Sequence, residues 1–142
     1  MQESRAAVLH APREREHPPF PRRELCLLPK GRHGEGIAAH YLALRGYTLL
    51  ARNSRFADVE IDLLARDGTC LVLVEVKLRT HRVVPARDAL APQQERRLLR
   101  AASVLLARHD WAQQVRVDLV AIDHDLNRRR LHLEHVCGVL PR

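Results

Sequence analysis

The dipeptide Asp67-Gly68 separates two apolar segments and predicts a tight hairpin between two strands. Residues 59–66 and 70–77 are the expected strands, and the second is apolar over its first five residues. A segment that is apolar on both faces is typical of a central strand in a covered sheet. The hairpin therefore predicts a sheet with helices packed against it.

Five further segments show regular hydrophobic patterns. The expected helices are residues 35–45 and 92–108, and the further strands are residues 47–52, 115–122 and 130–136. In the first helix, Ile37, Tyr41 and Leu44 form one apolar stripe. The resulting order, α-β-β-β-α-β-β, predicts an α/β fold in which helices flank a central sheet.

The chain has 142 residues, which suits one domain, and its first part differs from the rest. Residues 1–30 hold five of the eight prolines among scattered Arg and Glu, so we expect a disordered Pro/Arg-rich tail there. Residues 31–142 form the expected folded domain. The tail is either a basic extension that touches nucleic acid or a segment without function, such as one added by a start site placed too far upstream.

The charge balance is strongly basic, with 24 Lys and Arg against 17 Asp and Glu. A net charge of +7 favours a partner that carries phosphate, although a GC-rich genome would also raise the arginine content.

The sequence holds no apolar run of the roughly 18–20 residues that span a bilayer and no secretory signal. Three cysteines without a C-x-x-C pair indicate reduced thiols, so we expect a cytoplasmic protein without a membrane partner.

The polar residues of the hairpin are the strongest functional signal. Side chains alternate along a strand, so Glu75 and Lys77 share one face, and the hairpin brings Asp62 close to them. The sequence leaves the register open, because a slip of one residue would move a side chain to the other face. Glu35 adds a third carboxylate at the start of the first helix. Three carboxylates and a lysine at the edge of a sheet predict a site for a hard cation, Mg²⁺ or Mn²⁺.

Each of these residues also has a plain structural explanation. Glu75 and Lys77 could form an ordinary polar strand end, Glu35 could interact with the helix dipole, and Asp62 could pair with an arginine. Their combination, an Asp followed thirteen residues later by E-x-K across a hairpin, favours the functional interpretation. The histidines are spread over many segments without an H-x-x-x-H pair, so no histidine metal site is expected.

The chain resembles the YraN-like family of bacterial proteins in a series of short motifs. These are G-x-x-G-E (31–35), A-x-x-Y-L (38–42), R-G-Y (45–47), R-N (52–53), E-I-D-L-L-A (60–65), V-E-V-K-x-R (74–79), A-P-x-x-x-R-R-L (91–98) and R-V-D-L-V (116–120). The resemblance covers residues 31–137. That family is similar to the PD-(D/E)XK, or restriction-endonuclease-like, nucleases, including the archaeal-type Holliday junction resolvases.

The resemblance implies a restriction-endonuclease-like fold with a mixed central sheet. It also implies a Mg²⁺- or Mn²⁺-dependent endonuclease that hydrolyses phosphodiester bonds in DNA, with branched or otherwise structured DNA as the candidate substrate. In that reading Asp62, Glu75 and Glu35 hold the metal and Lys77 completes the catalytic set. The alternative is a non-catalytic module that keeps the fold and binds nucleic acid or protein.

The same resemblance bears on DNA contacts and on assembly. Arg79, Gln94 and Arg97 are the candidate nucleic-acid-binding residues, and a resolvase would act as a homodimer. Two positions depart from the family pattern, because Val59 replaces a glycine and Gln94 replaces a lysine of the second helix. A β-branched residue cannot take a positive φ without strain, so the backbone before Glu60 is expected to differ. Gln94 is expected to bind a phosphate oxygen more weakly than a lysine would.

Overall fold

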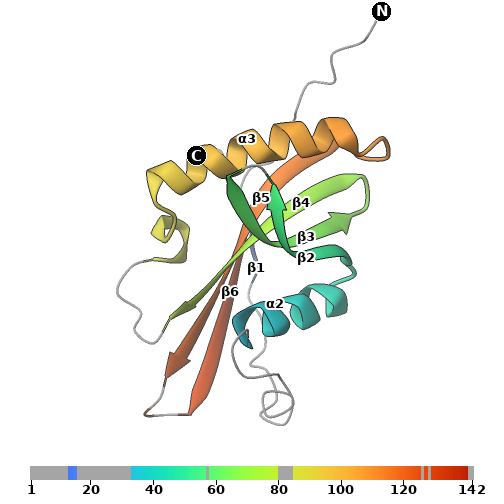
Figure 1. The fold of residues 1–142 in the computed structure, drawn as a ribbon. Coiled ribbons are helices and arrows are strands. Elements are labelled where there is room, and N and C mark those ends of the chain that lie inside the picture. The colour runs from blue at the N-terminus through green and yellow to red at the C-terminus, as the bar shows by residue number, and fades with distance from the viewer. Residues whose placement is uncertain are drawn as a thin grey trace, which may run out of the picture.

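The computed structural model describes residues 13–15, 33–56, 58–79, 85–125, 127 and 129–140. In these ranges a six-stranded mixed sheet has one long helix on each face (Figure 1). The strand order across the sheet is β1-β6-β5-β4-β3-β2. None of the described helices is long and apolar enough to cross a membrane.

The elements follow one another in the order expected from the sequence, with two additions. They are β1 (Arg13–Arg15), α2 (His33–Leu44), β2 (Thr48–Phe56), β3 (Val59–Asp67), β4 (Cys70–Arg79), the 3₁₀ turn η1 (Ala86–Asp88), α3 (Pro92–Arg108), β5 (Gln114–Asp125) and β6 (Arg130–Leu140). The additions are β1 and η1. The predicted α/β class and the order α-β-β-β-α-β-β are confirmed.

Neighbouring strands are antiparallel except for the central pair, β4 and β5, which run parallel. A parallel pair needs a crossover connection, and here η1 and α3 provide it. At the far edge β1 pairs with β6, with Arg15 opposite His135. Three residues of the segment expected to be a tail therefore extend the sheet, and the rest of residues 1–30 lie outside the described part.

The long helix α3 has the predicted bounds, because Pro92 is favourable in the first turn, where its missing N–H is not needed. Most strands are longer than predicted. The end of β2, up to Phe56, consists mostly of polar residues that pair with β3 through their backbone. A hydrophobic pattern cannot reveal strand residues of this kind, which explains why 47–52 was too short a prediction.

Two apolar layers hold the helices to the sheet. The layer under α3 contains the buried helix residues Leu98, Ala101, Ala102, Leu105 and Leu106. The layer under α2 contains Ile37, Ala38, Ala39, Tyr41 and Leu42. The predicted stripe of α2 is wrong at Leu44, which is 70% exposed. The helix ends there, Gly46 turns the chain at a φ of +87°, and the neighbouring Tyr47 enters the core instead.

The hairpin loop lies one residue later than predicted. Asp67 pairs with Cys70, so the loop consists of Gly68 and Thr69, and Gly68 adopts a φ of +61° that glycine accepts without strain. A loop displaced by one residue moves every cross-strand partner by two positions. Side chains from Leu63 onward therefore stay on the predicted faces, while the partner opposite each residue changes. Before Asp62 the predicted alternation is wrong, because Ile61 lies in the layer under α3 and Leu63 in the layer under α2.

Val59 does not have the backbone problem expected from its replacement of a glycine. Among the described non-glycine residues, positive φ angles occur only at Asn53 and Arg129. The Val59 side chain is buried in the layer under α3. The strand thus enters Glu60 with ordinary backbone geometry.

Candidate metal centre

Asp62 lies on β3, which has β2 on one side and β4 on the other. The ladder between β3 and β4 ends at Leu63, which is opposite Val74, and Asp62 and Glu75 are the next residues beyond this pair. The Oδ2 atom of Asp62 accepts a hydrogen bond from the backbone N–H of Val76 at 2.8 Å. The structure therefore brings the two predicted carboxylates together at the end of this ladder.

Glu75 is held by two neighbours through one of its oxygens. Its Oε1 atom accepts a hydrogen bond from Nε2 of Gln94 on α3 at 2.7 Å, and the Nζ atom of Lys77 lies 3.2 Å away. Lys77 also donates to Oε1 of Gln94 at 3.4 Å. The side chain of Glu75 is 5% exposed, yet its Oε2 atom is buried without a hydrogen-bond partner.

Glu35 joins this group from the first turn of α2. Its Oε2 atom is also buried without a hydrogen-bond partner. Burial, followed by the negative charge of Glu75 and then that of Glu35, raises the pKa of Asp62 to about 7, although the bond from Val76 opposes the shift. The charges of Glu75 and Glu35 therefore both act on Asp62, which places the three carboxylates in one group.

A divalent cation fits the donor set of Glu35, Asp62 and Glu75. The set offers carboxylate oxygens, which hard cations such as Mg²⁺ and Mn²⁺ prefer. A buried acceptor without a donor is unfavourable by roughly 1–3 kcal/mol, so the two free oxygens of Glu35 and Glu75 favour a further positive partner. These residues could hold the cation, and Lys77 and Gln94 lie beside them.

The candidate DNA contacts have partners within the protein. Both oxygens of Asp123 accept hydrogen bonds from Arg79, at 2.8 and 3.2 Å. Arg97 lies 3.6 Å from Asp58, in a pair whose side chains are both largely exposed. Gln94 is bound to Glu75 and Lys77, as described above, so it faces the carboxylates.

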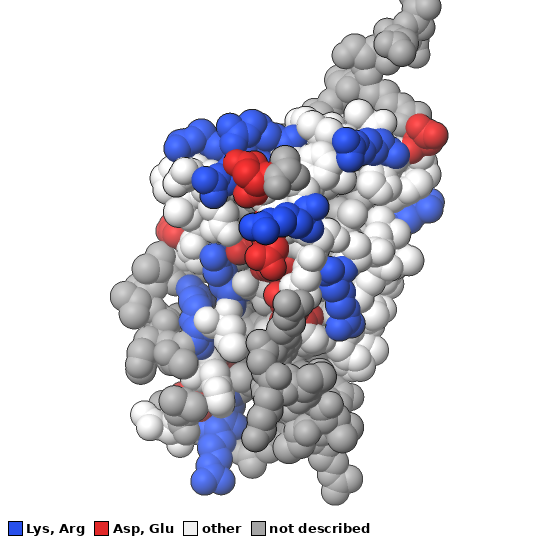
Figure 2. All heavy atoms as spheres, in the orientation of Figure 1, with Lys and Arg blue, Asp and Glu red and all other residues white. Residues whose placement is uncertain are grey.

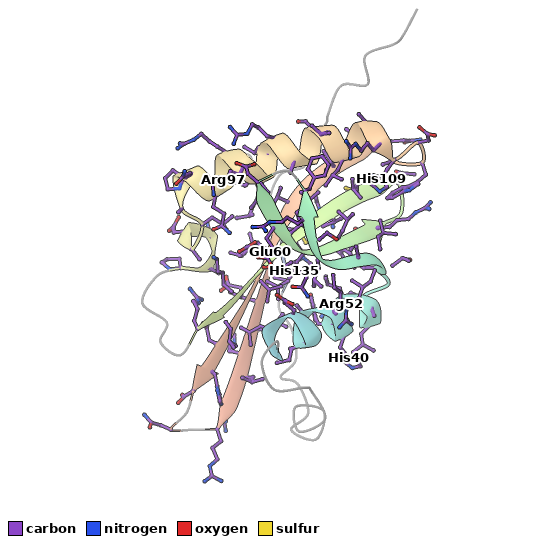
Figure 3. The ribbon with its side chains drawn as sticks, viewed as in Figure 1. His40, Arg52, Glu60, Arg97, His109 and His135 are labelled. Atoms are coloured by element: carbon purple, nitrogen blue, oxygen red, sulfur yellow. The ribbon has the colours of Figure 1, made fainter. Side chains whose placement is uncertain are left out.

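Basic side chains gather over α3 on the face that Figure 2 shows, with acidic side chains between them. Arg97 projects from this helix, whereas Arg52 lies on the side of α2 (Figure 3). Exposed ion pairs such as Arg97 with Asp58 are weak, so phosphate can compete for these arginines. The helix α3 thus carries a basic surface next to the carboxylates.

A second polar cluster, on the face covered by α2, was missed by the sequence analysis. Within the described ranges, one set of three potential ligand residues has atoms that all lie within 4.8 Å of one another, and it consists of Asp118, His135 and Cys137. Glu35 and the hairpin carboxylates are spaced more widely. The signal was the polar alternation within two otherwise apolar strands, R-V-D in β5 and H-V-C in β6.

Hydrogen bonds within the protein already saturate this second cluster. Asp118 Oδ1 accepts from Arg116 Nε at 2.9 Å and from the Gly138 N–H at 2.8 Å, and Oδ2 lies 2.8 Å from His135 Nε2. Burial alone would raise the pKa of Asp118, but His135 and Arg116 outweigh it and lower the pKa. The cluster stabilises the core and offers no free carboxylate oxygen to a metal.

The mixed sheet with a helix on each face is a restriction-endonuclease-like fold. The model of the uncharacterised protein family UPF0102 matches residues 34–122, which is more than half of the chain. The chain belongs to this family, so the YraN-like resemblance is confirmed. The matched range includes every residue of the candidate centre.

Individual relatives agree with the family match, and each bears the name UPF0102 protein. The relative from Chlorobium chlorochromatii is 37% identical over 111 residues, covering 75% of this chain and 86% of its own length. That from Kineococcus radiotolerans is 40% identical over 112 residues, covering 77% and 91%. That from Nitratidesulfovibrio vulgaris strain DP4 is 42% identical over 94 residues, covering 65% and 70%.

Proposed function

We propose that this protein is a cytoplasmic endonuclease that uses Mg²⁺ or Mn²⁺ to hydrolyse phosphodiester bonds in DNA. The observation that supports the proposal best is the closeness of Asp62 to Glu75 and Glu35, two of whose carboxylate oxygens are buried without partners. Such an arrangement is unfavourable in a purely structural role, because like charges repel in a poorly solvated place.

The residues of the centre divide into holding and orienting groups. The cation would be held by Asp62, Glu75 and Glu35. When bound, it would neutralise charge on the phosphate and lower the pKa of a water bound to it. Gln94 keeps Glu75 and Lys77 in place through its two hydrogen bonds. The ammonium of Lys77 would orient the attacking water or stabilise the charge that develops on the phosphate oxygens.

The basic surface of α3 would bind the DNA backbone. Arg97 is half exposed there and would exchange its weak pair with Asp58 for a phosphate. Contacts of this kind are independent of sequence, which suits a substrate recognised by its shape. Branched DNA is the candidate substrate, and cutting two strands symmetrically would require two copies of this chain.

The test is a cleavage assay on linear, nicked, single-stranded and four-way DNA with Mg²⁺, Mn²⁺ or EDTA. We expect cation-dependent cleavage with a preference for branched DNA. The matched control is the variant Glu60→Gln, which removes an exposed carboxylate from the same strand as Asp62. Absence of cleavage on every substrate with either cation would contradict the proposal.

One observation favours the non-catalytic alternative, a module that binds nucleic acid or protein. Gln94 and Lys77 both contact Oε1 of Glu75, so side chains of the protein already satisfy this oxygen. A binding module would keep this network for stability alone and would bind DNA equally well with EDTA. DNA affinity measured with and without Mn²⁺ therefore separates the two functions.

A further inference from the structure

Asn53 has an unusual backbone conformation in the middle of β2. Its φ is +48°, a left-handed value that is uncommon outside glycine and that asparagine tolerates better than most residues. The neighbouring pairs Arg52 with Leu63 and Ser54 with Ile61 keep the same register on either side of it. Asn53 and Asp62 are not themselves paired in the ladder, and the alternation of side chains breaks at this point, because Ile61 packs in the layer under α3 whereas Leu63 packs in the layer under α2.

The residue opposite Asn53 is Asp62. The pairs on either side of Asn53 place it across from Asp62, and on the other side of β3 the charge of Glu75 acts on Asp62. Asn53, Asp62 and Glu75 thus follow one another across three adjacent strands. The left-handed residue therefore stands in the same row as the candidate metal ligands.

The side chain of Asn53 shares a further property with this centre. Four side-chain polar atoms in the described part of the chain are buried without a hydrogen-bond partner, and they are Glu35 Oε2, Asn53 Oδ1, Glu75 Oε2 and Gln114 Oε1. Two of them belong to the candidate ligands and a third to Asn53. Native proteins leave few such groups unsatisfied, and those that remain often mark the place of a ligand, ion or water.

We propose that Asn53 Oδ1 supplies a neutral oxygen to the coordination shell of the divalent cation, in direct contact or through one cation-bound water. The inference rests on the proposed cation site at Asp62 and Glu75. An amide oxygen is a suitable ligand for a hard cation and adds no further negative charge to three carboxylates.

Two substitutions separate the side chain from the backbone conformation. In Asn53→Gly, the glycine adopts the positive φ without strain and the side-chain oxygen Oδ1 is removed. In Asn53→Asp, a side-chain oxygen remains at the same position. Arg129→Gly is the matched control, because Arg129 also has a positive φ, +50°, and lies in the turn between β5 and β6. The measurement is the affinity of the full chain for Mn²⁺ alone, by titration calorimetry without DNA.

We expect Asn53→Gly to weaken Mn²⁺ binding by about 10- to 100-fold, as is typical when a supporting group of a metal site is lost. Asn53→Asp should bind Mn²⁺ at least as tightly as the wild type, and Arg129→Gly should match the wild type. Circular dichroism and the thermal midpoint without metal confirm that each variant is folded.

Three results would overturn the inference, and they are distinguishable from failure of the proposed function. If the wild type binds Mn²⁺ and Asn53→Gly binds it equally well, the side chain has no role at the metal, while the carboxylate site stands. If Asn53→Asp loses binding as Asn53→Gly does, the amide N–H₂ group is required and not the oxygen. If the wild type binds no Mn²⁺, both the cation site and the role of Asn53 are wrong.

Discussion

The Nε2 atom of His135 lies 2.8 Å from Oδ2 of Asp118, and both side chains are completely buried beneath α2. On its other side, His135 Nδ1 lies 3.1 Å from the hydroxyl of Tyr41. Arg116 shares Asp118 with His135 and also pairs with Asp67 at 3.0 Å. Two cations and two carboxylates thus neutralise one another inside the domain, which is how buried charge is tolerated.

This pair predicts a loss of stability in mildly alkaline solution. Burial alone would lower the pKa of His135, but the hydrogen bond to Asp118 outweighs it and raises the pKa to about 9. A raised folded-state pKa means that the stabilisation is complete below about pH 6.5 and is lost as the pH rises through 9. The expected change is at most about 3 kcal/mol in the free energy of unfolding.

Urea denaturation at pH 6.5 and pH 9.5 measures this effect. The variant His135→Gln should be less stable than the wild type at pH 6.5 and should lose most of the difference between the two pH values. An equally strong pH dependence in His135→Gln would show that another group is responsible.

Replacing Asp62 separates catalysis from folding. Asp62→Asn removes a carboxylate that Glu75 and Glu35 repel, so the thermal midpoint without metal should stay constant or rise by a few degrees. Cation-dependent cleavage should fall by about 100-fold or more, because a metal ligand is lost. DNA binding should persist. A marked loss of stability in Asp62→Asn, together with a wild type that does not respond to Mg²⁺, would favour the binding module.

Lys77 should matter for the reaction more than for the cation. In Lys77→Ala, Glu75 keeps its bond from Gln94, so the affinity for Mn²⁺ should change by no more than a few-fold. Cleavage should fall by about 100-fold, the usual loss when a group that stabilises developing charge is removed. Single-turnover cleavage and calorimetry on the same variant measure both quantities. Loss of Mn²⁺ binding would assign Lys77 to holding Glu75 instead.

Gln94 should act by positioning Glu75. Gln94→Ala removes the 2.7 Å hydrogen bond to Glu75 Oε1 and is expected to weaken Mn²⁺ binding by about 10-fold. The exposed neighbour Gln93 provides the matched control, Gln93→Ala, which should behave as the wild type. If calorimetry shows equal Mn²⁺ affinity in both variants, the bond to Glu75 does not support the metal.

Arg97 should contribute to DNA binding through phosphate alone. Arg97→Ala is expected to weaken binding by a similar factor for all sequences and to reduce the slope of log affinity against log salt by about 1. Arg52→Ala, on the side of α2, should leave the slope unchanged (Figure 3). Fluorescence anisotropy over a range of salt concentrations measures both, and an equal change in the two variants would place the DNA elsewhere.

The sequence predicted the apolar framework well and the polar details poorly. Periodicity located α3 and every strand from β2 to β6, because burial of one face or of both leaves a regular pattern. Strand parity likewise held from Leu63 to Asp67, since a displaced loop altered the register by an even number of positions, but it did not reveal the break in alternation between Ile61 and Leu63. What sequence could not give was the partner of each polar group, which depends on three-dimensional register.

Gln94 and Asn53 illustrate this limit. Gln94 was expected to bind phosphate because a lysine stands there in the family, yet in the structure it donates a hydrogen bond to Glu75. Asn53 belonged to a motif without an assigned role. Its positive φ and its place opposite Asp62 became visible only with the strand pairing. The same holds for β1, which no hydrophobic pattern within the proline-rich segment indicated.

The meander of β2, β3 and β4 has a consequence for the order of folding. Asn53, Asp62, Glu75 and Lys77 all lie on these three consecutive strands, which are joined by short turns. Contacts between residues close in the chain form sooner than the parallel pairing of β4 with β5, which must wait for the α3 crossover. The carboxylates would thus be assembled, and repel one another, while the sheet is still incomplete. Cation available at that stage would favour folding, so refolding in Mn²⁺ should be faster than in EDTA.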